Sequence, residues 1–181
     1  VFYAAGVHPM NAADHPSVTV EELLILAKNK KFVGIGETGL DYFYTRESAS
    51  KQIESFEIHI EASRVFYDAI LGTLGCKPGI LSVNPTGHTR YLYLHENNMF
   101  IISEPINDEP SSIGNGSTVG FLVPDEETGN AWHQAGLDNG GETCEDPPGV
   151  RDVKKLMGTN MYLAYLRDPS GNKLCALKRM D

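Results

Sequence analysis

One stretch, residues 54–74 (ESFEIHIEASRVFYDAILGTL), constrains the fold more than any other part of the chain. Its apolar residues recur at spacings of three and four, which is the pattern of an amphipathic helix. A second interpretation takes Phe56, Ile58 and Ile60 as a short strand, with the intervening residues on the opposite face. Because the helical periodicity continues unbroken to residue 74, we predict one long helix.

Composition limits the classes of protein and partner. A chain of 181 residues with 41% hydrophobic residues can bury a core, as one domain or one and a fraction. The 24 acidic and 15 basic residues give a net charge of −9, which disfavours nucleic acid as a partner. This charge does not exclude a phosphate substrate that binds through a metal ion. No apolar run is long enough to cross a membrane. Val1 lies inside an apolar run typical of a strand, so we expect a truncated or processed N-terminus.

The three cysteines, Cys76, Cys144 and Cys175, are odd in number and lack the CxxC spacing of metal sites. Reduced thiols in a cytoplasmic protein are the simplest interpretation. For Cys175, we expect a buried, inert thiol rather than a nucleophile, since no histidine lies near it in the sequence.

The first third of the chain alternates strands and helices. We predict strands at residues 1–7 and 31–37, and helices at residues 19–29 and from residue 48 onward. Thr19 begins the first helix, and acidic residues in its first turn suit the helix dipole. This order is typical of a parallel α/β fold.

Three segments of this third, GVHPMNAAD (6–14), VEELLILAKNKKFVGIGETGLDYFY (20–44) and QIESFEIHIEASR (52–64), resemble the TatD family of metal-dependent deoxyribonucleases. The resemblance implies part of a TIM-like barrel, and it places Glu37 at a metal-ligand position of that family. The other ligands of the family have no counterpart here. Glu37 is therefore a weak metal candidate, and a capping or solvated carboxylate is the alternative.

After residue 62 the pattern changes to one helix followed by many short strands. Strands are predicted at residues 80–83, 90–95, 100–103, 117–123, 161–167 and 173–178. A helix is predicted at residues 129–139, and the DPSGN sequence at 168–172 is a strong turn signal.

Four ordered motifs in this part resemble the glyoxalase/bleomycin-resistance family. They are RVFYDAILGTLG (64–75), IGNGSTVGFLVP (113–124), GLDNGGETCEDPPGVR (136–151) and MYLAYLRDPSGNKLCAL (161–177). The resemblance implies an α+β fold of two βαβββ modules around a shared pocket. We therefore expect a TatD-like β/α fragment at residues 1–63 and a glyoxalase-like domain at residues 64–181.

Catalytic members of that family hold a divalent metal with His and Glu, where this chain has Thr118 and Cys175. We therefore expect no metal cofactor and no detectable enzyme activity; any activity would be of the lyase or isomerase type. The residues expected to line a small-molecule pocket are Thr118, Arg151, Tyr162, Tyr165 and Cys175. Alternatively, the two tyrosines are core residues and Arg151 forms a surface ion pair.

Three functions follow from these resemblances. The first is a glyoxalase-like module that binds a small molecule without a metal. The second is a recombined or engineered chimera with no selected activity. The third is residual TatD-like phosphodiester hydrolysis, for which Glu37 would be needed.

The join between the two resemblances leaves the first βαβββ module without a recognisable first strand. An unpaired sheet edge is unfavourable, so we predict that residues 2–6 or 32–36 join the glyoxalase-like sheet. A second chain could fill the same place, which would give a homodimer, with exchanged segments as one form of it.

Overall fold

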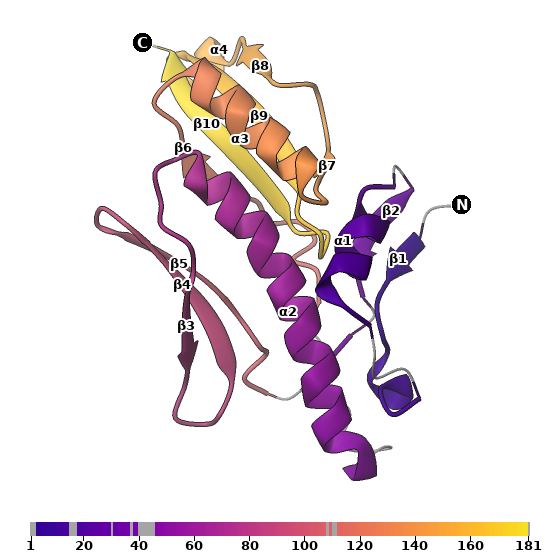
Figure 1. The fold of residues 1–181 in the computed structure, drawn as a ribbon. Coiled ribbons are helices and arrows are strands. Elements are labelled where there is room, and N and C mark those ends of the chain that lie inside the picture. The colour runs from indigo at the N-terminus through magenta and orange to yellow at the C-terminus, as the bar shows by residue number, and fades with distance from the viewer. Residues whose placement is uncertain are drawn as a thin grey trace.

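The computed structural model of the protein describes residues 3–14, 18–29, 31–36, 38–39, 46–107, 109 and 112–180. The fold is mixed α+β, and the long helix α2 (Ala49–Gly72) runs past every sheet of the described chain (Figure 1). Within the described ranges, no helix is both long enough and apolar enough to cross a membrane.

Helix α2 confirms the prediction of one long helix, and the strand alternative for residues 56–60 is wrong. Its 24 residues cross the position where the two sequence resemblances meet. The predicted apolar stripe is buried at Phe56, Tyr67, Ile70 and Leu71. Its first residue, Ile53, is 40% exposed, and the N-terminal half of the helix buries the polar residues Gln52, Ser55 and His59 instead. The helical periodicity decided the structure because it gives one continuous face for packing.

The N-terminal third forms a small layer beside the middle of α2 (Figure 1). Its elements are β1 (Tyr3–Ala5), η1 (Pro9–Asn11), α1 (Val20–Ala27), β2 (Phe32–Ile35) and η2 (Arg46–Ser48). Thr19 and Glu22 cap α1 reciprocally, as the sequence indicated for the start of this helix. Leu23 and Phe32 pack on Ala62 of α2, so this layer has a small core of its own.

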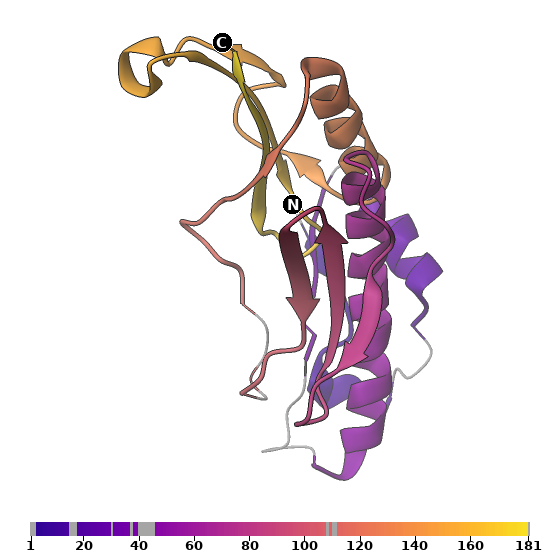
Figure 2. The same cartoon turned by 90° about the vertical axis from the view of Figure 1, so that its left-hand side faces the viewer.

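On its other side, α2 packs against an antiparallel sheet (Figure 2). The sheet consists of β3 (Ile80–Val83), β4 (Thr89–His95) and β5 (Asn98–Ser103), in the order β3-β4-β5. The ring of Tyr67 on α2 packs at a tilt of 41° against Phe100, with 4.9 Å between the ring centroids, and Tyr93 contacts Phe100 as well. Together, α2 and β3–β5 are the first module.

The second module contains the remaining elements. They are β6 (Val119–Leu122), α3 (Glu126–Asp138), β7 (Glu142–Thr143), β8 (Gly149–Arg151), α4 (Lys154–Met157), β9 (Asn160–Arg167) and β10 (Lys173–Met180). The sheet order is β6-β10-β9-β7, with β8 also paired to β9. Helix α3 lies against β9 at Gly129 and Gly136, where there is no room for a larger side chain. Trp132, fully buried, fills the space between this helix and the sheet.

The prediction that an N-terminal strand joins the glyoxalase-like sheet is wrong. Strands β1 and β2 pair in parallel with each other and form a separate two-stranded sheet. Within the described ranges, one backbone hydrogen bond, from the amide of Ile35 to the carbonyl oxygen of Pro169, links this sheet to the β9–β10 turn. The backbone groups of the two short strands pair with each other, and in the described part of the chain neither strand pairs with a larger sheet.

Candidate functional site

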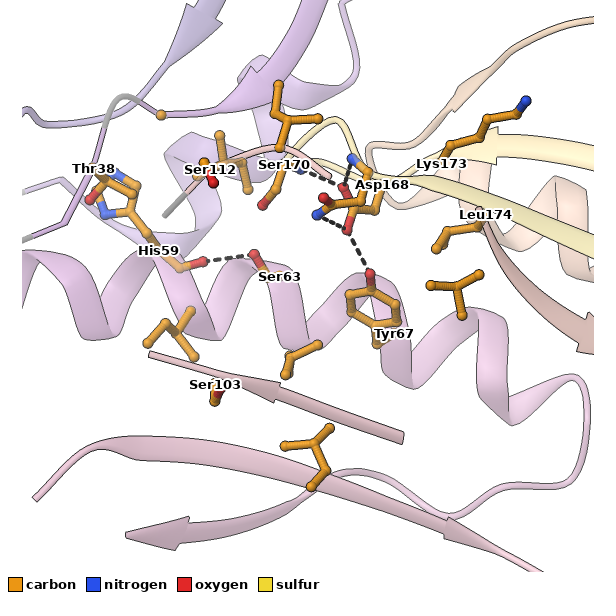
Figure 3. A pocket seen from close by; sticks show the side chains of 18 of the residues that line it. Thr38, His59, Ser63, Tyr67, Ser103, Ser112, Asp168, Ser170, Lys173 and Leu174 are labelled. Carbon is orange, nitrogen blue, oxygen red and sulfur yellow. Dashed lines mark hydrogen bonds between the residues drawn. The ribbon is translucent and has the colours of Figure 1, made fainter. Parts of the chain in front are cut away.

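A cavity of about 610 Å³ lies where the three parts of the chain meet. Helix α2 contributes one wall through Phe56, Ile60 and Ser63. The other walls are β5, the end of β2, the segment leading into β6, and the β9–β10 turn (Figure 3). The volume lies within the range of small-molecule sites in proteins.

Asp168 forms the polar centre of one end of the cavity. Its carboxylate, 5% exposed, accepts hydrogen bonds from the Tyr67 hydroxyl at 2.6 Å and from the Asn172 side chain at 3.1 Å. The backbone amides of Ser170 and Asn172 donate to its other oxygen at 3.0 and 2.8 Å. Burial raises the pKa of Asp168 above its usual value, although these donors oppose the shift. The carboxylate therefore connects the β9–β10 turn to α2. Its hydrogen-bond acceptor positions are occupied by these four donors.

His59 lies on α2, further along the cavity from Tyr67 (Figure 3). The ring is 2% exposed; Nε2 accepts from the Val7 amide at 3.1 Å, and Nδ1 lies 2.6 Å from the Ser55 carbonyl oxygen. These partners fit a neutral ring that carries its proton on Nδ1. Burial lowers the pKa of His59, so the ring is uncharged at neutral pH.

Hydroxyl groups dominate the remaining polar lining. Ser63 donates to the His59 carbonyl oxygen at 3.2 Å, and Ser103, Ser112 and Ser117 also line the cavity. Thr38 is 8% exposed, and no described residue offers its Oγ1 a hydrogen-bond partner. A buried hydroxyl without a partner is costly, and a bound molecule with a polar group could satisfy it.

The join between the two sequence resemblances carries an ionic network. Arg64 donates to Glu61 through Nε at 2.8 Å and forms an ion pair with Asp68. The Tyr91 hydroxyl donates to Glu61 at 2.8 Å, and the Tyr93 hydroxyl donates to Asp68 at 3.0 Å. The hydrogen bond from Arg64 is the main cause that lowers the pKa of Glu61. This network fixes β4 to α2 beside the cavity.

The five predicted pocket residues lie elsewhere, and the lining of the cavity includes none of them. Cys175 of β10 and Tyr165 of β9 are cross-strand partners, and Lys173 lies 4.8 Å from the centre of the Tyr165 ring. Arg151 of β8 forms a 3.8 Å ion pair with Asp146. Thr118 is exposed just before β6.

Tyr162 is separated from that group. Its ring is buried against Gly129 of α3, and its hydroxyl donates to Asn130 at 3.0 Å. Successive residues of a strand alternate between faces, so residues three apart, such as 162 and 165, lie on opposite sides of the sheet. The two tyrosines therefore lie on opposite faces of the sheet, as their spacing in the sequence already indicates.

The metal and thiol candidates from the sequence can be compared with the described residues. No group of three or more His, Cys, Asp or Glu side chains in the described ranges is arranged to hold a metal ion. Glu37, the candidate from the TatD resemblance, lies outside the described residues. Burial raises the pKa of the Cys175 thiol, which disfavours its reactive thiolate form.

Sequence reasoning did not identify the cavity. The sequence patterns place His59, Ser63 and Asp168 only within a helix and a turn. One signal was available: Ser63 is a small polar residue within the apolar stripe of α2. Tyr67 and Asp168 are 101 positions apart in the sequence, and a local sequence pattern cannot predict a contact between residues so widely separated.

The second module, with β6 and β9 on either side of β10 and α3 packed against them, defines one βαβββ unit, and α2 with β3–β5 is most of another. A crystal structure of a glyoxalase/bleomycin resistance protein from Albidiferax ferrireducens T118 matches with 51% sequence identity and a TM-score of 0.59. The match covers 66% of this chain and 90% of that one. The chain therefore belongs to the glyoxalase/bleomycin-resistance family.

The N-terminal part matches different proteins. A family profile described as "TatD related DNase" matches residues 1–70. The uncharacterized metal-dependent hydrolase YcfH of Escherichia coli K12 is 47% identical over 64 residues, which are 35% of this chain and 23% of that protein. The uncharacterized metal-dependent hydrolase BU355 of Buchnera aphidicola is 35% identical over 69 residues, which are 26% of that protein. The chain thus spans about a quarter of these curated relatives.

Proposed function

We propose that the protein is a small-molecule-binding member of the glyoxalase/bleomycin-resistance family that acts without a metal. Its site would be the cavity between α2, β5 and the β9–β10 turn. The observation that carries the proposal is a cavity of about 610 Å³ with a buried hydroxyl, Thr38 Oγ1, that has no partner among the described residues.

The charges around the cavity support a neutral ligand. Four donors occupy the Asp168 carboxylate, and His59 is held uncharged by burial. Lys173 reaches the lining but pairs with Glu145. A charged ligand would lose hydration without gaining a free opposite charge, whereas an uncharged one with an amide or hydroxyl group could meet the serine and threonine hydroxyls.

Saturation-transfer NMR with three small aromatic compounds tests this function. Benzamide, which is neutral, should give transfer, whereas benzoate and benzylammonium should give little. Ser63→Leu should weaken the benzamide signal, because it narrows the cavity and removes one of the lining hydroxyls. Ser50→Leu, on the exposed face of the same helix, is the matched control and should leave the signal unchanged. Equal binding of the three compounds, or a signal indifferent to Ser63→Leu, would refute the proposal.

We also infer that the chain arose by recombination of two genes. The support is that residues 1–70 match one family while a structure of another family matches 66% of the chain, and that the first match ends within α2. Sequencing the coding region and its flanks tests this origin. An intact TatD-like gene upstream of the codon for residue 1 would support recombination in nature, whereas vector sequence would support assembly in the laboratory.

A further inference from the structure

The two modules differ in what borders their last strand. In the second module, β6 runs parallel along the outer edge of β10, from the pair Leu174–Val119 to the pair Leu177–Leu122. In the first module, β5 has the place of β10, since it is the last strand and pairs antiparallel with the strand before it. Within the described residues, no strand pairs with the outer edge of β5.

The free edge of β5 is suited to accept a strand. The amide of Glu104 donates to the carbonyl oxygen of Thr89, and the alternation of an antiparallel ladder then directs the backbone groups of Met99, Ile101 and Ser103 outward. The six residues of β5 include no charged residue and no proline, which are the usual protections of an exposed edge.

The cavity runs along this same edge. Four consecutive residues of β5, Phe100 to Ser103, line it, so the strand meets the cavity with its backbone edge and not with one face. The α2 side chains Ile60 and Ser63 form an adjacent wall of the cavity. In the second module the corresponding helix, α3, contacts the edge strand in the same way, through Trp132 on Phe121 of β6. The space beside β5 therefore has the two boundaries that β6 has in the second module, a strand edge and a helix.

We propose that the cavity binds an extended peptide segment, which adds to the first module as a strand parallel to β5. This inference rests on the proposed function, because it uses the same cavity and extends its neutral ligand from a small molecule to a peptide segment. A segment of five residues spans about 17 Å, close to the length of β5. Every second side chain of the peptide should be apolar, because it would pack against Ile60. The hydroxyl of Thr38, which has no partner among the described residues, would form a hydrogen bond with a peptide group of the bound segment.

Fluorescence polarisation with a labelled peptide tests the inference. The probe is STVGFLV, the sequence of residues 117–123, because β6 occupies the equivalent place in the second module. Two N-methylated versions, each methylated on alternate residues, block one edge of the peptide at a time. One version should bind at least roughly tenfold more weakly than the other, because only one edge of the peptide bonds to β5. Equal affinities would overturn strand addition.

Variants of β5 locate the binding edge. Ile101→Pro removes an outward-facing amide and should weaken the peptide at least roughly tenfold, whereas Ile101→Ala keeps this amide and should bind within about threefold of wild type. Unfolding midpoints of the two variants report whether Ile101→Pro still folds. If it does not, Ser103→Pro provides the same test at the next outward-facing amide. Equal peptide binding by folded proline and alanine variants would refute the assignment to β5.

Two further results separate this inference from the proposed function. If benzamide binds and Ser63→Leu weakens its binding, but the peptide does not bind, the small-molecule site stands and the strand site is refuted. Analytical ultracentrifugation tests the other occupant. A wild-type dimer that Ile101→Pro converts to a monomer would mean that the edge holds a second copy of this chain, and the peptide proposal would fall.

Discussion

Each of the two βαβββ modules of this protein packs one helix against a sheet, but the strands of the two sheets differ. The second module is complete, with β6 on the edge of β10 and α3 packed closely at Gly129 and Gly136. Among the described residues of the first module, no strand pairs with the outer edge of β5, and a cavity lies there. The difference teaches that a helix and three strands can hold together without the fourth strand when other contacts fix the helix.

Those other contacts come from outside the first module as well as from within it. Tyr67 of α2 donates to Asp168 of the second module, and Ala62 of α2 belongs to the core of the N-terminal layer. The helix is therefore fixed from three directions, although one neighbouring edge is open. Trp132, the single tryptophan, lies in the second module, so its fluorescence reports that module while circular dichroism reports the whole chain.

The largest effect is expected where the two modules join. Asp168→Ala removes the acceptor of four hydrogen bonds in a buried turn and should lower the free energy of unfolding by about 3 kcal/mol or more. Urea unfolding followed by tryptophan fluorescence and by circular dichroism should show both transitions shifted together. The exposed Asp152→Ala is the control. A shift in only one of the two signals would mean that the modules unfold separately.

Glycine-to-alanine substitutions in the two helices should have opposite signs. A Cβ at Gly136 of α3 would lie 2.3 Å from Leu166 Cδ1, so Gly136→Ala should destabilise the protein by about 1–3 kcal/mol. Gly72 of α2 has nothing within 4 Å of such a Cβ, so Gly72→Ala should stabilise it by up to about 1 kcal/mol. Urea unfolding measures both. Similar losses at the two sites would contradict the contrast between the two helices.

The ionic network at the join of the two resemblances should contribute a smaller amount. A double-mutant cycle of Glu61→Gln and Arg64→Met should give a coupling energy of about 0.5–1 kcal/mol, because the pair is half-buried and shares Tyr91. The exposed pair Lys51–Glu54 on the same helix has the same spacing and should couple by no more than about 0.5 kcal/mol. Equal coupling in the two cycles would mean that the join has no special contribution.

The smallest effect concerns His59 and pH. Burial lowers its pKa in the folded protein, so the unfolded chain takes up the proton first. The stability due to the neutral ring is complete above pH 6.5 and declines as the pH falls below that value. Between pH 7 and pH 5, wild type should therefore lose more stability than His59→Gln. The exposed His95→Gln should follow the wild-type profile, and parallel curves for all three proteins would refute the assignment.

Several features could be predicted from the sequence because they depend on neighbouring residues. The periodicity of α2, the start of α1 at Thr19 and the turn at 168–172 are local patterns, and each formed as predicted. The spacing of Tyr162 and Tyr165 was also sufficient to place them on opposite faces, although the pocket prediction grouped them. The motifs were sufficient to identify the glyoxalase/bleomycin-resistance family, with which the 51% identical Albidiferax structure agrees.

Only the tertiary structure decided what surrounds the open edge of β5. Strands β1 and β2 could pair with each other or with a larger sheet, and their sequences suit both arrangements. The cavity exists because segments from three parts of the chain, around Thr38, Ser63 and Asp168, meet without filling the space between them. Local patterns determine helices and strands through short-range backbone geometry. Strand pairing and cavities depend on contacts between residues far apart in the sequence, and a local pattern carries no information about those contacts.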